Sequence, residues 1–544
     1  MAYCRNRTVV LKHDPDNHKR DGYIALGHGR LCPGRDTDFG YRSVDEGTLM
    51  AELSEQIRRA ILGRNPLVYI HSSEEDRIIA LIGDLARETA DGAWPVRQWS
   101  CVTGLDGATA GPDTRDPLAA LQVLLASRER GFFVMKDLAG FLTQPQVVRA
   151  LRDFYYNNRG RLDRFLFIVG PELVIPEGLR KELHLVEAPP PGEPEISREI
   201  DRVMAGYPGV GIPDEHRPEI VLALKGMTLA EIDHVLHRIF QAGEQSQAAT
   251  LNEIFNEKEM VVSKAGFLEF CPPRLSVANI GGLANLKDWL ARRKALFSQE
   301  AIDAGVPTPK GLLIMGVSGC GKSLAVKAIS SLWNVPLFRL DMNLVFSGLH
   351  GSPEAAFHQA LKTVETVAPA VLWIDEIENS LGMTEDSIEM ASHIFSAFLT
   401  WMQEKPPLIF IAATANRIHA LPAEVIRKGR FDQVFFVDLP DDVERREVLE
   451  IHLRLNGGTP DDFDLKMLVI QMDGWSGAEI EQAVVSARID AYAENRPFNM
   501  RDVNAAVARI VPLSKTMEAQ IKGIRDWAFD RATPASRRSR RGAY

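Results

Sequence analysis

The chain has 544 residues, 45% of them hydrophobic and 25% charged, which is typical of a globular protein and too long for one hydrophobic core. Its formal net charge of -10 argues against a chain-wide attraction for nucleic acid, and five scattered cysteines without C-x-x-C spacing predict neither a disulfide framework nor a zinc site. Because no apolar run reaches about 18 residues and no signal-peptide pattern opens the chain, we expect a cytoplasmic protein that does not enter a membrane.

Residues 1–48 are polar and lack a sustained period, which predicts a disordered extension. A spurious upstream start is the alternative. Order is expected from Met50, because Leu53, Ile57 and Ile61 have helical spacing and a strand-like run follows them.

Strands and helical patterns then alternate in two series, which predicts two α/β units with parallel sheets. A linker around Cys271-Pro272-Pro273 separates the two. The expected strands are Leu67–Ile70, Val96–Cys101, Phe132–Lys136 and Phe165–Val169 in the first unit, and Leu312–Met315, Leu337–Asp341, Ala370–Ile374, Leu408–Ala412 and Phe435–Val437 in the second.

The two units are similar to each other, because corresponding segments occur in the same order. FFVMKDLAGFL from Phe132 matches VLWIDEIENSL from Val371, and LKGMTLAEIDHVL from Leu224 matches MDGWSGAEIEQAV from Met472. An internal repeat is one interpretation. The other is the strand-turn-helix rhythm that any two α/β domains share.

The chemistry of the two units differs. The second carries GVSGCGKS where the first carries HSSEEDR, and it has Asp375-Glu376 where the first has Asp137-Leu138. Without the glycines and the lysine, the first unit is expected to bind no nucleotide.

The stretch KGLLIMGVSGCGKS places Gly316, Gly321, Lys322 and Ser323 at the positions of the motif G-x-x-x-x-G-K-[ST]. Backbone N–H groups of such a loop wrap phosphates, and the N-terminus of the following helix adds partial positive charge. Lys322 would reach the β/γ-phosphates and Ser323 would bind Mg²⁺. The flanking strand up to Met315 and a helix over 324–333 provide the context that the motif requires.

A second motif, VLWIDEIE, is an apolar strand that ends in two carboxylates. Asp375 would hold Mg²⁺ through water beside Ser323, and Glu376 would polarise the attacking water. The alternative is a solvated acidic turn.

From Ser276 to Val511 the chain resembles an AAA ATPase module of the proteasomal, FtsH and cell-division-cycle kind, on the ordered motifs VANIGGLANLKDWL, GVSGCGKS, VLWIDEIE, AATANR, LPAEVIRKGRFDQVFFVDLP, EVLEIHLR and GWSGAEIEQAV. It is most similar to the AAA proteins of the hypothetical chloroplast reading-frame group of algal plastids and cyanobacteria. That resemblance implies an α/β fold, a P-loop NTPase αβα sandwich with a helical lid, preceded by a degenerate AAA-like α/β domain. The implied domains are a disordered extension (1–48), the degenerate domain (50–250), a linker (251–275), the ATPase α/β subdomain (276–440), the helical lid (441–513) and a C-terminal helix with a basic tail (514–544).

The resemblance also implies roles for individual residues. Asn416 corresponds to sensor 1, although the insertion of Ala415 leaves Thr414 as the alternative. Arg427 and Arg430 resemble arginine fingers, which complete the site of a neighbouring subunit; surface arginines are the alternative. The implied nucleotide-binding set is Ile280 and Gly281 beside Asn279 at the adenine, His452 at the ribose, Gly477 and Ala478 at sensor 2, Asp375, and the loop residues Gly316, Val317, Ser318, Gly319, Cys320, Gly321, Lys322, Ser323 and Leu324.

Three weaker signals accompany these motifs. The pore-loop pattern is either Phe346-Ser347-Gly348 or Leu349-His350-Gly351, so the usual aromatic residue is in doubt. Cys320 could have a lowered thiol pKa beside Lys322 and a helix end, or it could be a small filler. No H-E-x-x-H motif occurs, so an FtsH-like protease is not expected.

These observations predict an ATPase that uses ATP and Mg²⁺, assembles as a homo-oligomer, expected to be a hexameric ring, and remodels an unknown protein client. A nucleotide-switched scaffold is the alternative. A nucleic-acid remodeller has only the basic tail RATPASRRSRRGAY in its favour.

Overall fold

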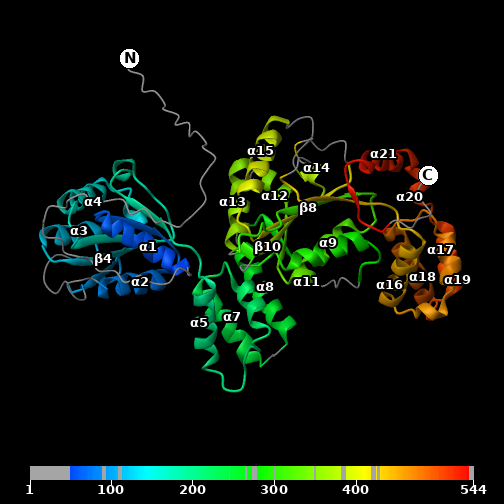
Figure 1. Cartoon of the computed structure of the whole chain (residues 1–544), viewed down its shortest axis with the longest axis horizontal. Helices are drawn as coiled ribbons and strands as arrows, with labels where there is room; N and C mark the ends of the chain where they lie inside the picture. Colours follow the sequence, from blue (N-terminus) through cyan, green and yellow to red (C-terminus); the bar gives the residue numbers. More distant parts are fainter. Residues whose placement is uncertain are drawn as a thin grey trace, which may run out of the picture.

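The computed structural model of the protein describes residues 49–88, 94–107, 113–243, 246–263, 266–272, 279–298, 301–302, 304–347, 351–380, 388–417, 424 and 429–537. Figure 1 shows a first α/β unit, a helical bundle, a second α/β unit and a second bundle. Within the described ranges, no helix has the length and apolar character needed to span a membrane. The predicted disordered extension, Arg427 and the end of the basic tail lie outside these residues.

The first unit is a six-stranded sheet in the order β3-β2-β4-β5-β1-β6, parallel except for the β2–β3 pair. Alternate residues of its central strands face two separate cores: Val68 and Ile70 pack with α1 and α2, whereas Leu67 and Tyr69 pack with α3 and α4. Its strands are β1 (Leu67–His71), β2 (Val96–Ser100), β3 (Gly104–Leu105), β4 (Gly131–Lys136), β5 (Arg164–Gly170) and β6 (His184–Glu187). Its helices are α1 (Leu49–Leu62), α2 (Glu75–Arg87), α3 (Pro117–Ala126), α4 (Pro145–Asn158) and the short 3-10 turns η1 (Leu138–Phe141) and η2 (Glu177–Leu179).

A helical bundle follows the first sheet and has its own apolar core. It consists of α5 (Glu193–Met204), α6 (Arg217–Leu224), α7 (Leu229–Ala242) and α8 (Gln247–Ser263). The stretch 251–275, predicted as a linker, is therefore not one. Leu251, Ile254 and Phe255 on α8 are buried in the bundle, while Val262 packs against the second sheet, so α8 contacts both bodies.

The second unit is a seven-stranded sheet in the order β13-β12-β8-β11-β10-β9-β7, parallel except for the β7–β9 pair. Helices α9 and α11 cover one face, and α13, α15 and α21 cover the other. The strands are β7 (Leu268–Cys271), β8 (Gly311–Gly316), β9 (Leu337–Leu340), β10 (Ala370–Ile374), β11 (Ile409–Ala415), β12 (Gln433–Val437) and β13 (Thr533–Pro534). The helices are α9 (Ala284–Lys294), α11 (Lys322–Trp333), α12 (Met342–Phe346), α13 (Pro353–Thr366), α14 (Ile377–Ser380) and α15 (Ile388–Glu404).

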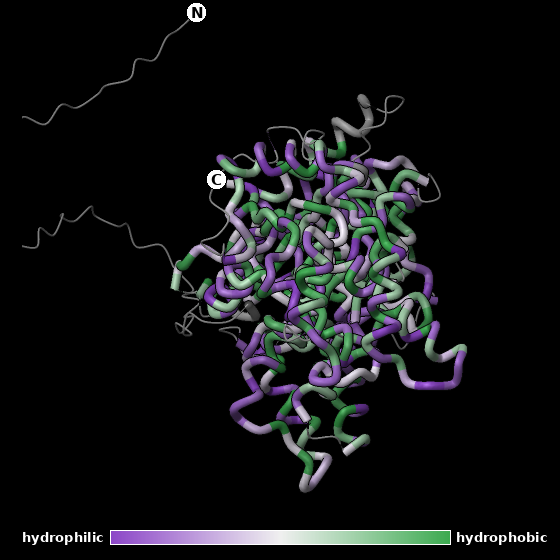
Figure 2. Tube along the Cα trace, turned by 90° about the vertical axis from the view of Figure 1, so that its right-hand side faces the viewer, coloured by the Kyte–Doolittle hydropathy of each residue, from purple (hydrophilic) through white to green (hydrophobic). Residues whose placement is uncertain are grey.

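The second bundle follows β12 and packs around a separate core that includes Trp475. It consists of α16 (Asp442–Leu455), η5 (Pro460–Asp462), α17 (Leu465–Gln471), α18 (Gly477–Ala493) and α19 (Met500–Arg509). The chain then returns to the second sheet through α20 (Leu513–Thr516), α21 (Glu518–Phe529) and β13. Seen from the side, apolar stretches fill the interior and many outer loops are hydrophilic (Figure 2).

The two sheets share one strand order. Reading β6-β1-β5-β4-β2 in the first against β12-β8-β11-β10-β9 in the second gives the same succession of strands along the chain. The fold predicted from the sequence, a P-loop sandwich with a helical lid after a degenerate AAA-like α/β domain, is confirmed. The nine predicted strands are present with small shifts at their ends, whereas the edge strands β3, β6, β7 and β13 were not predicted because they are short.

Candidate nucleotide site

The glycine-rich loop, residues 317–321, connects β8 to α11 and lies between the end of β12 and the start of α18. Gly316 has φ 145°, and a Cβ there would lie 1.9 Å from the carbonyl oxygen of Val437, so only glycine fits. Gly319 accepts a hydrogen bond from the N–H of Ala478 at 2.9 Å, and a Cβ on Gly319 would come within 3.1 Å of the Ala478 Cβ. Backbone contacts on both sides therefore fix the loop.

Lys322 is the first residue of α11, and its side chain is buried. Its ammonium donates hydrogen bonds to the carbonyl oxygens of Gly316 at 3.0 Å and Val317 at 2.8 Å. Burial lowers the pKa of Lys322, and nearby carboxylates act in the opposite direction. The loop thus holds a cation in place beside its own backbone.

Two carboxylates follow β10 and meet the end of β11. Thr414 donates to Asp375 Oδ1 at 2.6 Å, and its hydroxyl oxygen accepts from the N–H of Glu376 at 3.0 Å. Asn416 donates from Nδ2 to Glu376 Oε1 at 2.7 Å. Both candidates for the sensor position therefore contact the carboxylate pair, because residues two apart on a strand face the same side.

Glu378 was not predicted as a site residue. It is 2% exposed, and its Oε1 accepts from the backbone N–H groups of Asn416 at 2.8 Å and Arg417 at 2.9 Å. It stands three residues after Asp375 at the start of α14, which is the signal that could have revealed it. Glu378 therefore anchors the backbone at the end of β11.

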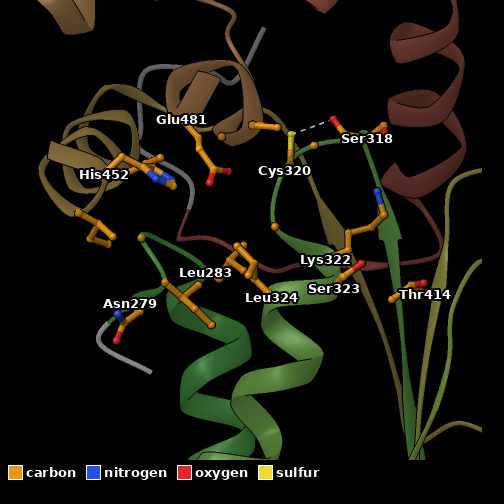
Figure 3. A pocket seen from close by; sticks show the side chains of 18 of the residues that line it. Asn279, Leu283, Ser318, Cys320, Lys322, Ser323, Leu324, Thr414, His452 and Glu481 are labelled. Atoms are coloured by element: carbon orange, nitrogen blue, oxygen red, sulfur yellow. Dashed lines mark hydrogen bonds between the residues drawn. The ribbon is translucent and has the colours of Figure 1, made fainter. Parts of the chain in front are cut away.

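The glycine-rich loop, the two carboxylates, Thr414 and Asn416 line a cavity of about 310 Å³, which Figure 3 shows from close by. It lies between the second sheet and the second bundle, and both bodies contribute to its walls. The lining residues are Asn279, Ile280, Gly281, Leu283, Ser318, Gly319, Cys320, Gly321, Lys322, Ser323, Leu324, Asp375, Glu376, Thr414, Asn416, Val448, Ile451, His452, Gly477, Ala478 and Glu481.

The end of the cavity away from the carboxylates is less polar. Asn279, Ile280 and Gly281 approach α16 there, and a Cβ on Gly281 would lie 2.7 Å from Val448 Cγ2. Burial lowers the pKa of His452, which favours the neutral imidazole. Val448 and Ile451 were not predicted, although Val448 lies four residues before His452 on the same helix and Ile451 directly precedes it. A flat heterocycle and a sugar fit this chemistry.

The predicted nucleotide-binding residues from Ser318 to Leu324 come together in this cavity with the other predicted groups, whereas Gly316 and Val317 support the loop from beneath. Arg430 is described but does not line the cavity; it donates to the carbonyl oxygen of Glu424. Arg427 lies outside the described residues.

Two weaker predictions do not match the geometry of the site. Burial raises the pKa of the Cys320 thiol to about 12, so the suggested lowering of that pKa is wrong and the thiol stays protonated. Phe346, one candidate for the pore-loop aromatic, packs against the core of the second unit at the end of α12. Leu349 and His350 lie outside the described residues.

At the corresponding place in the first unit, β1 ends at His71 and α2 begins at Glu75, which leaves only residues 72–74 between them. Arg77 on α2 is buried and pairs with Glu74 at 2.7 Å and Glu195 at 2.9 Å. Glu74 also accepts from the N–H of Leu229, the first residue of α7, at 2.7 Å. Side chains of the protein itself therefore pair with each other where the second unit has its loop and cavity.

The residues of the second unit fit a magnesium nucleotide. In the part of the chain that the structure describes, no group of three or more His, Cys, Asp or Glu could hold a metal, so Mg²⁺ would depend on Ser323, Asp375, water and phosphate oxygens, as is usual for this ion. Asn416 Oδ1 is buried without a hydrogen-bond partner among the described residues, so this oxygen can accept a hydrogen bond from a bound water or ligand.

Comparison with known proteins finds similarity to AAA ATPases along most of the chain. Family models match residues 53–188 (SpoVK-like AAA ATPase, N-terminal domain), 194–265 (SpoVK-like AAA ATPase, second domain) and 312–439 (ATPase family associated with various cellular activities). The chain is 35% identical over 473 residues to the uncharacterized AAA domain-containing protein ycf46 of Guillardia theta, covering 86% of this chain and 92% of the relative. It is 33% identical to the ycf46 protein of Pyropia yezoensis, covering 89% and 99% of the two chains. A shorter match, 31% identical over 38% of this chain and 35% of the relative, is to the ATP-dependent zinc metalloprotease FtsH of Thermotoga maritima. The chain therefore belongs to the AAA ATPases, and within them to the ycf46 group.

Proposed function

We propose that the protein binds ATP with Mg²⁺ in the cavity of the second unit and hydrolyses it. The observation that carries the proposal is the convergence of Lys322, Asp375, Glu376 and Asn416 on one cavity whose other end is apolar enough for a nucleobase. The first unit supplies no second site, because its loop is short and Arg77 is paired internally.

The residues of the site have separate roles. The N–H groups of the loop and the ammonium of Lys322 bind phosphate oxygens and orient them. Ser323 and Asp375 would hold Mg²⁺, which neutralises phosphate charge when bound. Glu376 takes up the proton of the attacking water and Asn416 keeps that carboxylate oriented, which the 2.7 Å hydrogen bond between them supports.

We further propose that the active form is a ring of identical subunits, expected to be a hexamer. Arg430 does not line the cavity of its own subunit, which supports a role at the site of a neighbour. An arginine supplied across an interface can be worth about 10³ to 10⁵ in rate. Arg427, three residues earlier in the sequence, would act with it.

The work done by such a ring is proposed to be the remodelling of a protein partner. Family membership supports this class of function. Because Phe346 packs against the core of the second unit, we assign it no role in contacting a client as a pore-loop aromatic. Glu376→Gln should bind Mg·ATP with an affinity close to that of the unmodified chain and should hydrolyse it at least about 100-fold more slowly. Hydrolysis that survives this substitution would contradict the assignment of the water-activating residue.

The shared site can be tested by mixing two inactive variants. Arg430→Ala should bind ATP and hydrolyse it slowly, whereas Lys322→Ala should bind ATP about 100-fold more weakly and should not hydrolyse it. Where the two meet in one ring, a site with an intact loop faces an intact arginine, so part of the activity should return. A mixture that co-assembles and stays as inactive as its components would contradict the ring mechanism. The control is Arg446→Ala, an exposed arginine on α16.

A further inference from the structure

We infer that Thr414 is a positioning residue whose hydroxyl fixes Asp375 and Glu376 relative to each other, an inference that rests on the proposed hydrolysis of ATP. Thr414 is 1% exposed and lies in β11, beside both residues that follow β10. It was considered from the sequence only as a substitute for Asn416.

The two hydrogen bonds of this hydroxyl have a defined direction. The N–H of Glu376 can only donate, so at 3.0 Å it gives its proton to the Thr414 oxygen. The single hydroxyl proton then points to Asp375 Oδ1 at 2.6 Å. A buried O–H group that donates to a carboxylate makes one of the stronger neutral-to-charged hydrogen bonds. Thr414 therefore restricts the rotation of the Asp375 carboxylate.

The same hydroxyl supports an unusual backbone conformation. Glu376 has φ 46°, in the left-handed region that disfavours a residue with a side chain. The hydrogen bond to its N–H helps to hold that conformation, which directs the Glu376 side chain toward Asn416. Loss of the hydroxyl would remove one restraint from the Asp375 carboxylate and one from the backbone N–H of Glu376.

Ala415 explains why two polar residues serve one carboxylate pair. It is buried in the core on the opposite face of β11, while Thr414 and Asn416, on either side of it, face the cavity. Without this one residue the threonine and the asparagine would be adjacent and would face opposite sides. The two residues thus have complementary roles. Thr414 orients Asp375, which would hold Mg²⁺, and Asn416 orients Glu376, which would activate water.

The test compares Thr414→Val, which keeps the shape and removes the hydroxyl, with Thr414→Ser, which keeps the hydroxyl. Thr414→Val should lower kcat about ten- to a hundredfold and raise the Mg²⁺ concentration for half-maximal stimulation, while the Kd for ADP without metal stays within about threefold. Thr414→Ser should recover most of kcat. The matched control is Thr400→Val, because Thr400 is an exposed threonine that bonds only to its own helix.

Each outcome decides the inference. A kcat unchanged in Thr414→Val, or an equal loss in Thr414→Ser, would overturn it, because the hydroxyl would then have no role beyond packing. The proposed function is tested separately by hydrolysis in the unmodified chain and its loss in Glu376→Gln. If the unmodified chain does not hydrolyse ATP, the Mg²⁺ dependence of ADP binding still reports on Asp375, and a Thr414→Val variant with an unchanged dependence would refute the positioning role by itself.

Discussion

The two α/β units have the same strand order but differ at the turn from the first central strand into its helix. In the second unit five residues, 317–321, form an open loop with Lys322 behind it. In the first unit only residues 72–74 make the turn, and Arg77 pairs with Glu74 and Glu195. The difference teaches that one strand order can carry either a glycine-rich loop or a set of paired side chains that join the sheet to its helical bundle.

One backbone feature is common to both units; it agrees with the match of FFVMKDLAGFL to VLWIDEIENSL and corrects the pairing of Asp137-Leu138 with Asp375-Glu376. Asp137 has φ 49° and Glu376 has φ 46°; Asp137 is the first residue after β4, and Glu376 is the second residue after the equivalent strand β10. Asp137 thus corresponds to Glu376, not to Asp375, and Lys136 takes the position of Asp375. The first unit therefore has the same left-handed turn, but a lysine stands where the second unit has Asp375.

The largest effect is expected for Lys322→Ala. Loss of the charge should weaken nucleotide binding about 100-fold and abolish hydrolysis, because backbone N–H groups alone cannot replace a charge-assisted contact. Calorimetry on the full chain should show one binding site before the substitution and none after it. A site that kept its full affinity after Lys322→Ala would contradict the assignment of Lys322 or mean that the first unit also binds nucleotide. Lys362→Ala, at an exposed position on α13, is the control.

The next largest effect is expected for Arg77→Met, which leaves Glu74 and Glu195 buried without their cation. The free energy of unfolding of the first unit should fall by about 3 to 5 kcal/mol, measured by urea denaturation. The affinity of the second unit for ADP should not change. Arg87→Met, on the exposed side of the same helix, should have little effect on either quantity. Equal losses for the two variants would contradict a buried network.

A smaller, pH-dependent effect is expected at Lys258, which joins the first bundle to the second unit. This lysine is fully buried, its ammonium nitrogen donates to the carbonyl of Val367 at 3.0 Å, and burial lowers its pKa to about 7. Between pH 7 and the ordinary pKa of 10.5, Lys258 is protonated in the unfolded chain but mostly neutral in the folded chain. The contribution of Lys258 to the free energy of unfolding is therefore highest at high pH and falls as the pH falls toward 7.

Between about pH 7 and pH 10 the free energy of unfolding should therefore rise with pH by up to about 1.4 kcal/mol per unit from Lys258 alone. Lys258→Met should remove this slope and stabilise the chain at pH 7, as measured by urea denaturation at a series of pH values. Lys466→Met, at an exposed lysine of α17, should keep the slope. A slope that survived Lys258→Met would place its origin elsewhere.

The smallest effect is expected for Lys136→Ala. Lys136 holds the position that Asp375 has in the second unit, but it forms a partly exposed pair with Glu75. Such pairs contribute about 0 to 1 kcal/mol, so both stability and ATPase rate should remain nearly unchanged. Asp375→Ala should instead abolish Mg²⁺-dependent hydrolysis. If Lys136→Ala and Asp375→Ala reduced hydrolysis by similar amounts, Lys136 would have a role in hydrolysis that its ion pair with Glu75 does not indicate.

The sequence could predict what depends on local order. Apolar periods located the central strands, and spacing within the phosphate loop located Lys322 and Ser323, because motif residues are held by the same short stretch of chain. The hydrogen bonds of Glu378 and Thr414 and the approach of Val448 to Gly281 could not be found in this way, since each depends on how one element is placed against another. The helical character of 251–263 was missed because its apolar residues face two different bodies, which blurs a single period.

The last strand gives the second bundle an attachment at each end. The bundle leaves the sheet after β12, and α21 brings the chain back so that β13 pairs with β12 in parallel, with Ala535 buried beneath. Asn285 donates to the carbonyls of Pro534 and Ser536, each at 3.0 Å, and ties this strand to α9. A force applied to the chain beyond residue 537 would therefore act on β13 and the sheet before it acted on the second bundle. The second bundle would not carry this force, which would act on the sheet that also carries the candidate nucleotide site.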